Sequence, residues 1–320
     1  MKTLAIGRIC QDEFFLVRRA KDRIASTKLT ADYIGRQFGG SVFSEAKLLC
    51  EAGVETTLLV GMAEGDAQFG DMPLHIKTVN TSATPRSLVY LKEEYKLDRI
   101  YSVEEREGEQ IAPTPELLEQ IEQEAPARLL YDLRQTALMK AVLDRLHSRV
   151  ELTVLDPGST VFYTEDESQK QDVAHMIQKS DVICAGSDFF WHYGKLNRLS
   201  DYFSHPLFGS AQLLIATLPD GRNVFAARDF YFTIYRLNQL SIGNTMGAGD
   251  AFRGAFLAAW QEGRHSISYE AVLNGAKMAV AAATLKIENK CPMPQMPQMA
   301  DIRLFAERLA LRIKKDDSLT

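Results

Sequence analysis

The chain has 320 residues, which is enough to bury the core of one large domain or of two small ones. Its hydrophobic content of 46% and charged content of 25% are ordinary for a soluble globular protein. The formal net charge of −5 provides no basic field, so we do not expect nucleic acid as a partner.

The sequence shows no leader-like segment and no apolar run of membrane-spanning length, so we expect a cytoplasmic protein with no membrane partner. Its four cysteines lack CxxC spacing, which favours reduced thiols over a zinc site. They are Cys10, Cys50, Cys184 and Cys291.

Short apolar runs alternate with helix-like stretches along the chain. The runs have the length and continuous apolarity of strands buried on both faces of a sheet, and they cover residues 4–7, 57–61, 129–131, 152–155, 182–184 and 213–216. The helix-like stretches cover residues 41–53, 114–125, 135–148 and 167–180. This order predicts an α/β fold with three α/β/α layers around a doubly wound, mostly parallel sheet.

Two segments interrupt the alternation. Residues 13–29 and 86–103 have mixed polarity and indicate β-hairpins with no helix between their strands. We expect a single domain over residues 1–320, with inserted β segments at 13–36 and 84–106 that form a small second sheet. That sheet could be a lid over a site, a homodimer surface or an ornament without function.

The stretch "SIGNTMGAGDAFRGAF", residues 241–256, indicates a glycine-containing turn at the start of a helix. The helix is predicted to begin near Ala248, which places Gly247, Ala248 and Gly249 at its N-terminus. Backbone amides there have no partner within the helix, and the helix dipole favours negative charge. The turn therefore suits a phosphate or a phosphoryl group in transfer.

Asp250 follows directly, and its carboxylate would repel a phosphate that was merely bound. It could accept the proton of an attacking hydroxyl, or it could simply cap the helix, and spacing does not separate these interpretations. The chain contains no P-loop, dinucleotide-binding, protein-kinase or nucleophile-elbow motif.

The stretch "NTMGAGDAFRGAF" resembles the C-terminal motif of the ribokinase-like (PfkB) carbohydrate kinase family, and the resemblance extends along nearly the whole chain. "LAIGRICQD" is similar to the family's opening strand, which ends here at Asp12. "FGGSVFSEAKLLCEAG" is similar to its glycine-pair motif, here Gly39 and Gly40. "GAKMAVAAATLKI" has the length and place of the helix that flanks the adenine.

The resemblance implies an ATP-dependent kinase that uses Mg²⁺ and phosphorylates a small sugar-like substrate. Asp250 would be the general base, and the Gly247–Gly249 amides would stabilise the transferred group. The sugar would contact Asp12, Gly39 and Gly40, with Ser44 beside them. The nucleotide end would include Ser187, Thr217, Gly221, Asn244, Thr245 and Lys277, and a monovalent cation could lie near Asn244.

The sequence departs from the family pattern mainly at this nucleotide end. "SDFF", from Ser187, stands where the family has N-x-x-E, and Thr217 begins T-L-P instead of T-x-G. Because the family's N-x-x-E segment organises Mg²⁺, its absence here leaves no metal ligand that can be assigned. Ser44 replaces an asparagine in the glycine-pair motif, and Asn244 stands at the first acid of the C-terminal motif. Asp188 could replace the lost carboxylate, or it could be an ordinary loop residue at a strand end.

Three basic residues could also contact ligand. Arg99 and Arg134 suit a phosphate or a sugar carboxylate, although an arginine taken alone is more often solvated. Lys277 lies near the expected nucleotide site and is similarly ambiguous. The expected function is a sugar kinase with Asp250 as base. The alternative is a kinase-fold protein that has lost turnover and serves as a ligand-binding or regulatory module.

Overall fold

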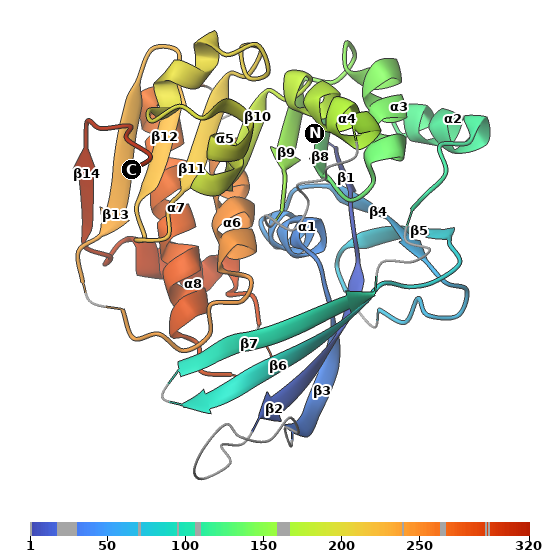
Figure 1. Ribbon diagram of the computed structural model, residues 1–320, viewed down its shortest axis with the longest axis horizontal. Coiled ribbons are helices and arrows are strands. Elements are labelled where there is room, and N and C mark those ends of the chain that lie inside the picture. Colours follow the sequence, from blue (N-terminus) through green and yellow to red (C-terminus); the bar gives the residue numbers. More distant parts are fainter. Residues whose placement is uncertain are drawn as a thin grey trace.

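The computed structural model describes residues 2–17, 31–69, 72–94, 96–105, 110–158, 167–238, 240–262, 267–291, 293 and 295–320. Of these, the side chains of residues 92–94, 96–105, 167–168 and 261–262 are left undescribed. The chain forms two sheets, a large one covered by helices and a small one that projects from it (Figure 1).

The large sheet has ten strands within the described residues, in the order β14-β13-β12-β11-β10-β9-β8-β1-β4-β5. Pairing is parallel from β11 to β5 and antiparallel from β11 to β14. The strands are β1 (Thr3–Ile6), β4 (Thr56–Met62), β5 (His75–Asn80), β8 (Arg128–Asp132), β9 (Leu152–Asp156), β10 (Val182–Gly186), β11 (Leu213–Thr217), β12 (Asn223–Ala227), β13 (Tyr231–Arg236) and β14 (Leu311–Lys314).

Helices cover both faces of this sheet because its central strands are apolar on both sides. In β1, Leu4 and Ile6 belong to one hydrophobic cluster and Ala5 to another on the opposite face. The Ala5 face packs against α1 (Ser41–Glu51), α6 (Ala248–Glu262), α7 (Tyr269–Glu288) and α8 (Met299–Ala306). The other face packs against α2 (Pro115–Gln123), α3 (Thr136–Leu146), α4 (Glu167–Gln178), α5 (Ser187–Gly194) and the 3₁₀ helix η2 (Leu199–Ser204). The three-layer, mostly parallel fold predicted from the sequence is confirmed.

The local predictions for the large sheet also hold. All six apolar runs are strands, and all four helix-like stretches are helices. The N-terminus of α2 shows why: the Thr114 hydroxyl accepts a hydrogen bond from the Leu117 amide, and Pro115 occupies the first turn, where it forfeits no helical hydrogen bond. The loop interpretation of Asp188 is wrong, because this residue lies in the first turn of α5.

The small sheet has the order β3-β2-β6-β7, from β2 (Cys10–Val17), β3 (Ala31–Gly39), β6 (Arg86–Glu94) and β7 (Lys96–Glu105). The hairpin predicted at 86–103 is β6 and β7. The first hairpin differs from prediction, because the partner of β2 lies at Ala31–Gly39, and residues 18–30 fall outside the described residues. Parallel pairing of β2 with β6 joins the two halves.

The small sheet packs against the main body through its own apolar cluster. Phe14, Val89 and Leu91 are buried there, and Met246 from the loop before α6 packs against them. This contact places the small sheet beside the glycine turn. Among the described residues, no helix combines the length and apolarity needed to cross a bilayer.

Candidate active site

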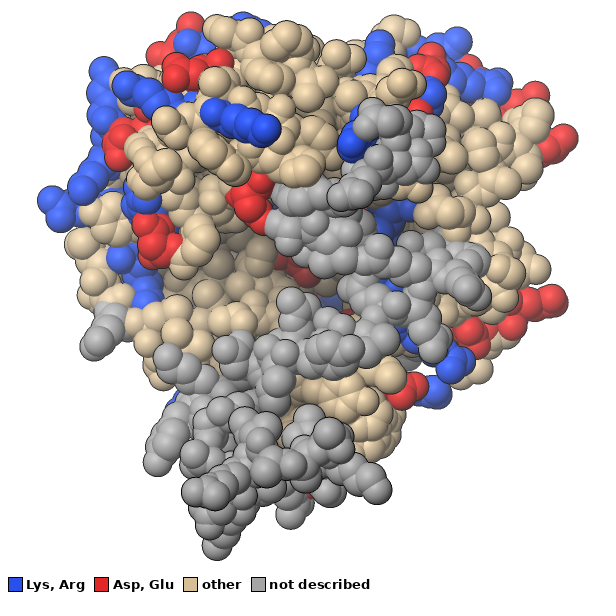
Figure 2. All heavy atoms as spheres, viewed as in Figure 1, with Lys and Arg blue, Asp and Glu red and all other residues tan. Residues whose placement is uncertain are grey.

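A cavity of about 590 Å³ lies between the carboxyl ends of the parallel strands and the small sheet. Figure 2 shows the corresponding hollow, with acidic side chains at its edge. In open parallel sheets, ligands commonly bind at this end of the strands. The residues that line the cavity are Arg8, Cys10, Asp12, Gly40, Ser41, Ser87, Val89, Asp132, Arg134, Pro157, Gly158, Gly186, Asp188, Thr217, Thr245, Met246, Gly247, Asp250 and Arg253.

The glycine turn forms one wall of this cavity. Gly247 has φ +72°, a left-handed conformation that glycine adopts at little cost, and α6 begins at the next residue, Ala248. The Asn244 side-chain oxygen accepts a hydrogen bond from the Met246 amide at 3.0 Å, which holds the approach to the turn. The predicted helix start is therefore confirmed. The Ala248 amide donates a hydrogen bond to the Thr245 carbonyl at 3.3 Å, which closes the turn, and Gly247 lines the cavity at this helix N-terminus.

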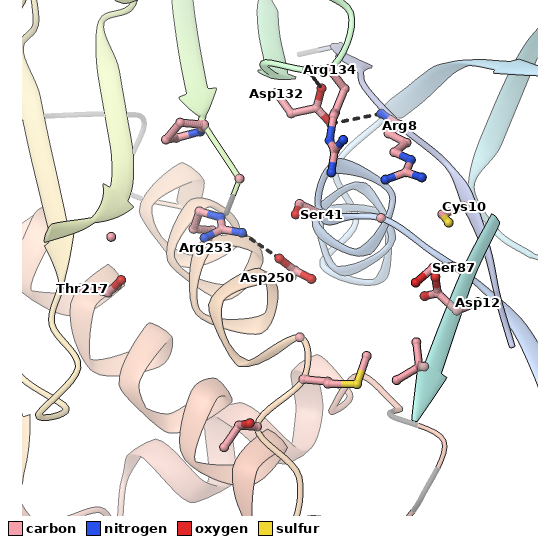
Figure 3. A pocket seen from close by; sticks show the side chains of 18 of the residues that line it. Arg8, Cys10, Asp12, Ser41, Ser87, Asp132, Arg134, Thr217, Asp250 and Arg253 are labelled. Atoms are coloured by element: carbon pink, nitrogen blue, oxygen red, sulfur yellow. Dashed lines mark hydrogen bonds and ion pairs between the residues drawn. The ribbon is translucent and has the colours of Figure 1, made fainter. Parts of the chain in front are cut away.

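Asp250 lies in the first turn of α6 and is held by Arg253, one turn further along (Figure 3). Arg253 Nη2 is 2.7 Å from Asp250 Oδ1 and 2.8 Å from Asp156 Oδ2. Arg253 Nε is 2.6 Å from Glu45 Oε1. One guanidinium therefore joins three carboxylates that come from α1, β9 and α6.

Burial dominates the electrostatics of this cluster. It raises the pKa of Glu45 well above its usual value, and the charge of Asp156 adds to the effect. Burial also raises the pKa of Asp250, while the positive charge of Arg253 opposes that rise. Burial would lower the pKa of Arg253, but the surrounding carboxylates together raise it well above its usual value. The arginine is therefore a permanent cation, and Asp250 is a stronger base than an exposed aspartate.

The same carboxylates raise the question of a metal. Oxygens of Glu45, Asp156 and Asp250 lie within 4.8 Å of one another, a spacing that could surround an ion. Arg253 forms an ion pair with each of them, so a cation already occupies the centre of the group. These residues therefore do not fit a dedicated metal cage, whereas the glycine turn does fit a phosphate.

The small sheet supplies the opposite wall. Successive side chains of a strand point to opposite faces, so Cys10 and Asp12 of β2 share the cavity face with Ser87 and Val89 of β6. Asp12 lies directly opposite Ser87 in the parallel register. This wall presents a carboxylate and a hydroxyl, which are groups suited to the hydroxyls of a small polar ligand.

A pair of glycines lets Asp12 and Arg8 approach the backbone just before α1. The Asp12 carboxylate packs against the Gly39 backbone, where a Cβ would clash with it. Gly40, with φ +122°, precedes α1, and a Cβ there would clash with the Arg8 carbonyl. The glycine pair of the sequence therefore serves close packing around the cavity wall.

Two arginines and an aspartate form the corner where β1 and β8 end. Asp132 accepts hydrogen bonds from the backbone amides of Arg8 at 3.0 Å and of Arg134 at 2.8 Å. Burial raises the pKa of Asp132 to about 6 despite these hydrogen bonds. The side chains of Arg8 and Arg134 line the cavity on the same side of it (Figure 3).

The structure brings many of the predicted site residues to this one cavity. Those that line it are Asp12, Gly40, Arg134, Thr217, Thr245, Gly247 and Asp250. Ser44 and Gly39 line an adjoining hollow that shares Asp12, Gly247 and Asp250 with the cavity.

Other predicted residues lie elsewhere. Ala248 and Gly249 form the first turn of α6, and Ser187 begins α5 beside Asp188. Asn244 is buried below the turn, Gly221 is in the exposed turn between β11 and β12, and Lys277 is exposed on α7. The side chain of Arg99 is outside the described part of the structure.

Sequence reasoning missed Arg253, Glu45 and Lys286. Arg253 and Lys286 each interrupt an apolar helical stretch, "AFRGAFLAAW" and "AAATLKI", and Glu45 is fully buried in α1. A charge at an otherwise buried helical position was the available signal, since such a charge needs a partner. Arg8 had no comparable signal, because it directly follows a strand.

No protein-family model matches the sequence, and no curated protein matches it significantly. Solved structures do resemble the fold. A ribokinase from Giardia lamblia has a TM-score of 0.77 at 15% identity, covering 96% of this chain and 99% of its own. A nucleoside kinase from Methanocaldococcus jannaschii, described as an archaeal member of the ribokinase family, has a TM-score of 0.70 at 17% identity, covering 96% and 98%.

The ribokinase of Arabidopsis thaliana, solved with ribose and ATP, has a TM-score of 0.70 at 16% identity and covers 95% of this chain and 98% of its own. At such identities the likeness shows the fold alone. The chain therefore has the ribokinase-like fold, as the resemblance of its motifs implied.

Proposed function

We propose that this protein transfers a phosphoryl group from ATP to a hydroxyl of a small sugar or sugar derivative. The observation that carries the proposal is that Asp250 and Gly247 share one cavity with Asp12. A base, an anion-binding turn and a hydroxyl-binding wall therefore face the same space. Neighbours of the same fold include a ribokinase solved with ribose and ATP, which supports this assignment.

In this proposal Asp12 and Ser87 orient the acceptor, and Asp250 accepts the proton that its hydroxyl loses. Arg253 holds Oδ1 of Asp250, which keeps the carboxylate oriented at the cavity. The backbone amides of Gly247, Ala248 and Gly249 stabilise the negative charge of the group in transfer. The small sheet limits access of water, so that hydrolysis does not compete.

ATP and Mg²⁺ are part of the proposal. ATP supplies the phosphoryl group, and Mg²⁺ neutralises phosphate charge. Thr217, Thr245 and Asp188 line the cavity at the carboxyl ends of β10 and β11 and beside the glycine turn, and these residues would hold the nucleotide and its metal. Mg²⁺ commonly relies on phosphates, water and one or two carboxylates, so a single aspartate at this end suffices.

The direct test is Mg·ATP-dependent ADP release measured across sugars, sugar acids and nucleosides. Turnover with one acceptor that falls at least about a hundredfold in Asp250→Asn supports the proposal, because a general base contributes on that scale. Ligand binding without turnover in wild type and variant alike would instead identify a binding or regulatory module.

A further inference from the structure

Lys286 is a buried lysine close to the glycine turn. It lies two residues before the end of α7, and its exposed fraction is 1%. No described residue accepts a hydrogen bond from its Nζ. A buried ammonium without a partner is costly, so its position calls for an explanation.

Its side chain ends behind Gly247. A Cβ on Gly247 would lie 3.4 Å from Lys286 Cε and 3.8 Å from Asp250 Oδ2. The charged or titratable groups that face the ammonium are Asp250 from α6 and Cys291 from the segment after α7. Neither forms a hydrogen bond with it. Lys286 is not among the residues that line the cavity, so its ammonium acts on a ligand at the turn through its charge, from behind Gly247.

We propose that Lys286 completes the anion-binding turn by placing a fixed positive charge behind Gly247, where it attracts a phosphate group bound to the α6 amides. The ligand chemistry is a phosphate, carried by a nucleotide, by a phosphorylated product or free in solution. This inference rests on the proposed function for its role in transfer, but phosphate binding itself requires no turnover.

Two effects follow from this placement. The charge strengthens binding of the phosphate group. It also lowers the pKa of Asp250 and so favours the ionised form of that carboxylate. Burial lowers the pKa of Lys286 to about 8, while Asp250 opposes that fall. The charge is therefore largely present at pH 7 and absent at pH 9.5, which provides a readout without mutation.

The experiment compares thermal unfolding of wild type, Lys286→Met and Lys290→Met, with and without inorganic phosphate. Lys290 is an exposed lysine four residues further along and is the matched control. We expect Lys286→Met to unfold at a higher temperature without ligand, because a buried unpaired charge is removed. We also expect its affinity for phosphate to fall by about tenfold or more, because a positive charge close to the bound anion is removed from a partly buried site.

Further arms identify the source of the phosphate. A loss in Lys286→Met that is larger for Mg·ATP than for Mg·ADP assigns the terminal phosphoryl group of the donor. A loss seen with inorganic phosphate alone assigns a free anion. In wild type, the phosphate response should weaken between pH 7 and pH 9.5, and this change should be missing in Lys286→Met.

The inference is overturned if Lys286→Met keeps its phosphate response, if the wild-type response is unchanged across this pH range, or if the variant simply unfolds at a lower temperature, as expected for a structural lysine. The outcome is separable from that of the proposed function. Asp250→Asn should retain phosphate binding while losing any turnover, because the substitution removes a repelling carboxylate and leaves Lys286 in place.

Discussion

Arg253 Nη2 lies 2.7 Å from Asp250 Oδ1 and only 2.8 Å from Asp156 Oδ2, so one nitrogen joins the candidate base to the end of β9. The arginine side chain is 10% exposed and also pairs with the fully buried Glu45. Removing one partner of a buried ion pair is expensive because the other charge stays desolvated.

Arg253→Met should therefore lower the free energy of unfolding by about 3–5 kcal/mol, as measured by urea denaturation. Glu45→Gln is the matched control. The raised pKa of Glu45 means that its ionised form is already disfavoured, so its neutral replacement should cost much less. Equal losses in the two variants would contradict the assignment of Arg253 as the centre of the cluster.

Activity should depend on pH through Asp250. In the proposed function Asp250 acts as a base and must be ionised, and burial raises its pKa above the ordinary value of 3.8. kcat/KM should therefore fall as pH drops through this raised pKa. The Ser41 hydroxyl holds the pKa down, so Ser41→Ala should move the acid limb to higher pH. An acid limb that stays in place in Ser41→Ala would argue against Asp250 as its source.

Gly247→Ala should separate backbone strain from function. Gly247 and Gly221 both have positive φ, +72° and +85°, so alanine at either should destabilise the fold by about 1–3 kcal/mol. Gly221 lies in an exposed turn away from the cavity wall. Turnover and phosphate binding should fall only in Gly247→Ala, and parallel losses in both would indicate a general effect of strain.

Asp132 should make stability depend on pH. Its pKa in the folded protein is about 6, against an ordinary value of 3.8, so the folded state binds the proton more tightly than the unfolded state. Stability should therefore be higher below pH 4 than above pH 6, with a loss of about 3 kcal/mol across that window from this residue. Urea denaturation at several pH values checks this prediction. The stability difference between Asp132→Asn and wild type should change across the window, and a constant difference would refute the prediction.

If the small sheet is a homodimer surface, which is one of the three interpretations that the sequence leaves open, it has a candidate contact. Tyr33 is 56% exposed and lies 5.5 Å from the Phe15 ring, which stacks at 5.3 Å on Tyr90. Tyr33→Asp should convert a dimer into monomers, because it places a charge in an aromatic contact. Sedimentation velocity distinguishes dimers from monomers. A wild-type protein that sediments as a monomer would contradict the prediction of a dimer through the small sheet.

The sequence predicts the central parts of the fold well for a physical reason. Strands such as β8 and β11 are buried on both faces, so their apolarity is continuous and easy to recognise. Strands β5 and β14 lie at the sheet edges, and most of their side chains are exposed. Their sequences therefore contain polar residues and lack the continuous apolar run by which a strand is recognised. The position of β3 was misjudged because its side chains are mostly half-buried or exposed, so the strand has no continuous apolar run.

The residues of the candidate site also differ in whether the sequence alone can predict them. The glycine turn and Asp250 are contiguous in the sequence, so their spacing carries the signal. Arg253 and Glu45 are 208 positions apart, and their ion pair exists only because α1 packs beside α6. Lys286 meets the turn only through the packing of α7 on α6. Contacts between distant segments cannot be obtained from the spacing of a single sequence.

The two walls of the cavity belong to two separately hydrogen-bonded sheets. Alternate residues of β2 and β6, such as Cys10 and Ser87, form one wall of the cavity, whereas the glycine turn belongs to the main body. In the proposed function the first wall binds the acceptor and the turn binds the phosphate. Natural variation or directed evolution can therefore change which acceptor is accepted by exchanging a few alternate side chains. The group-transfer machinery, with its buried charges, would be inherited unchanged by each new specificity.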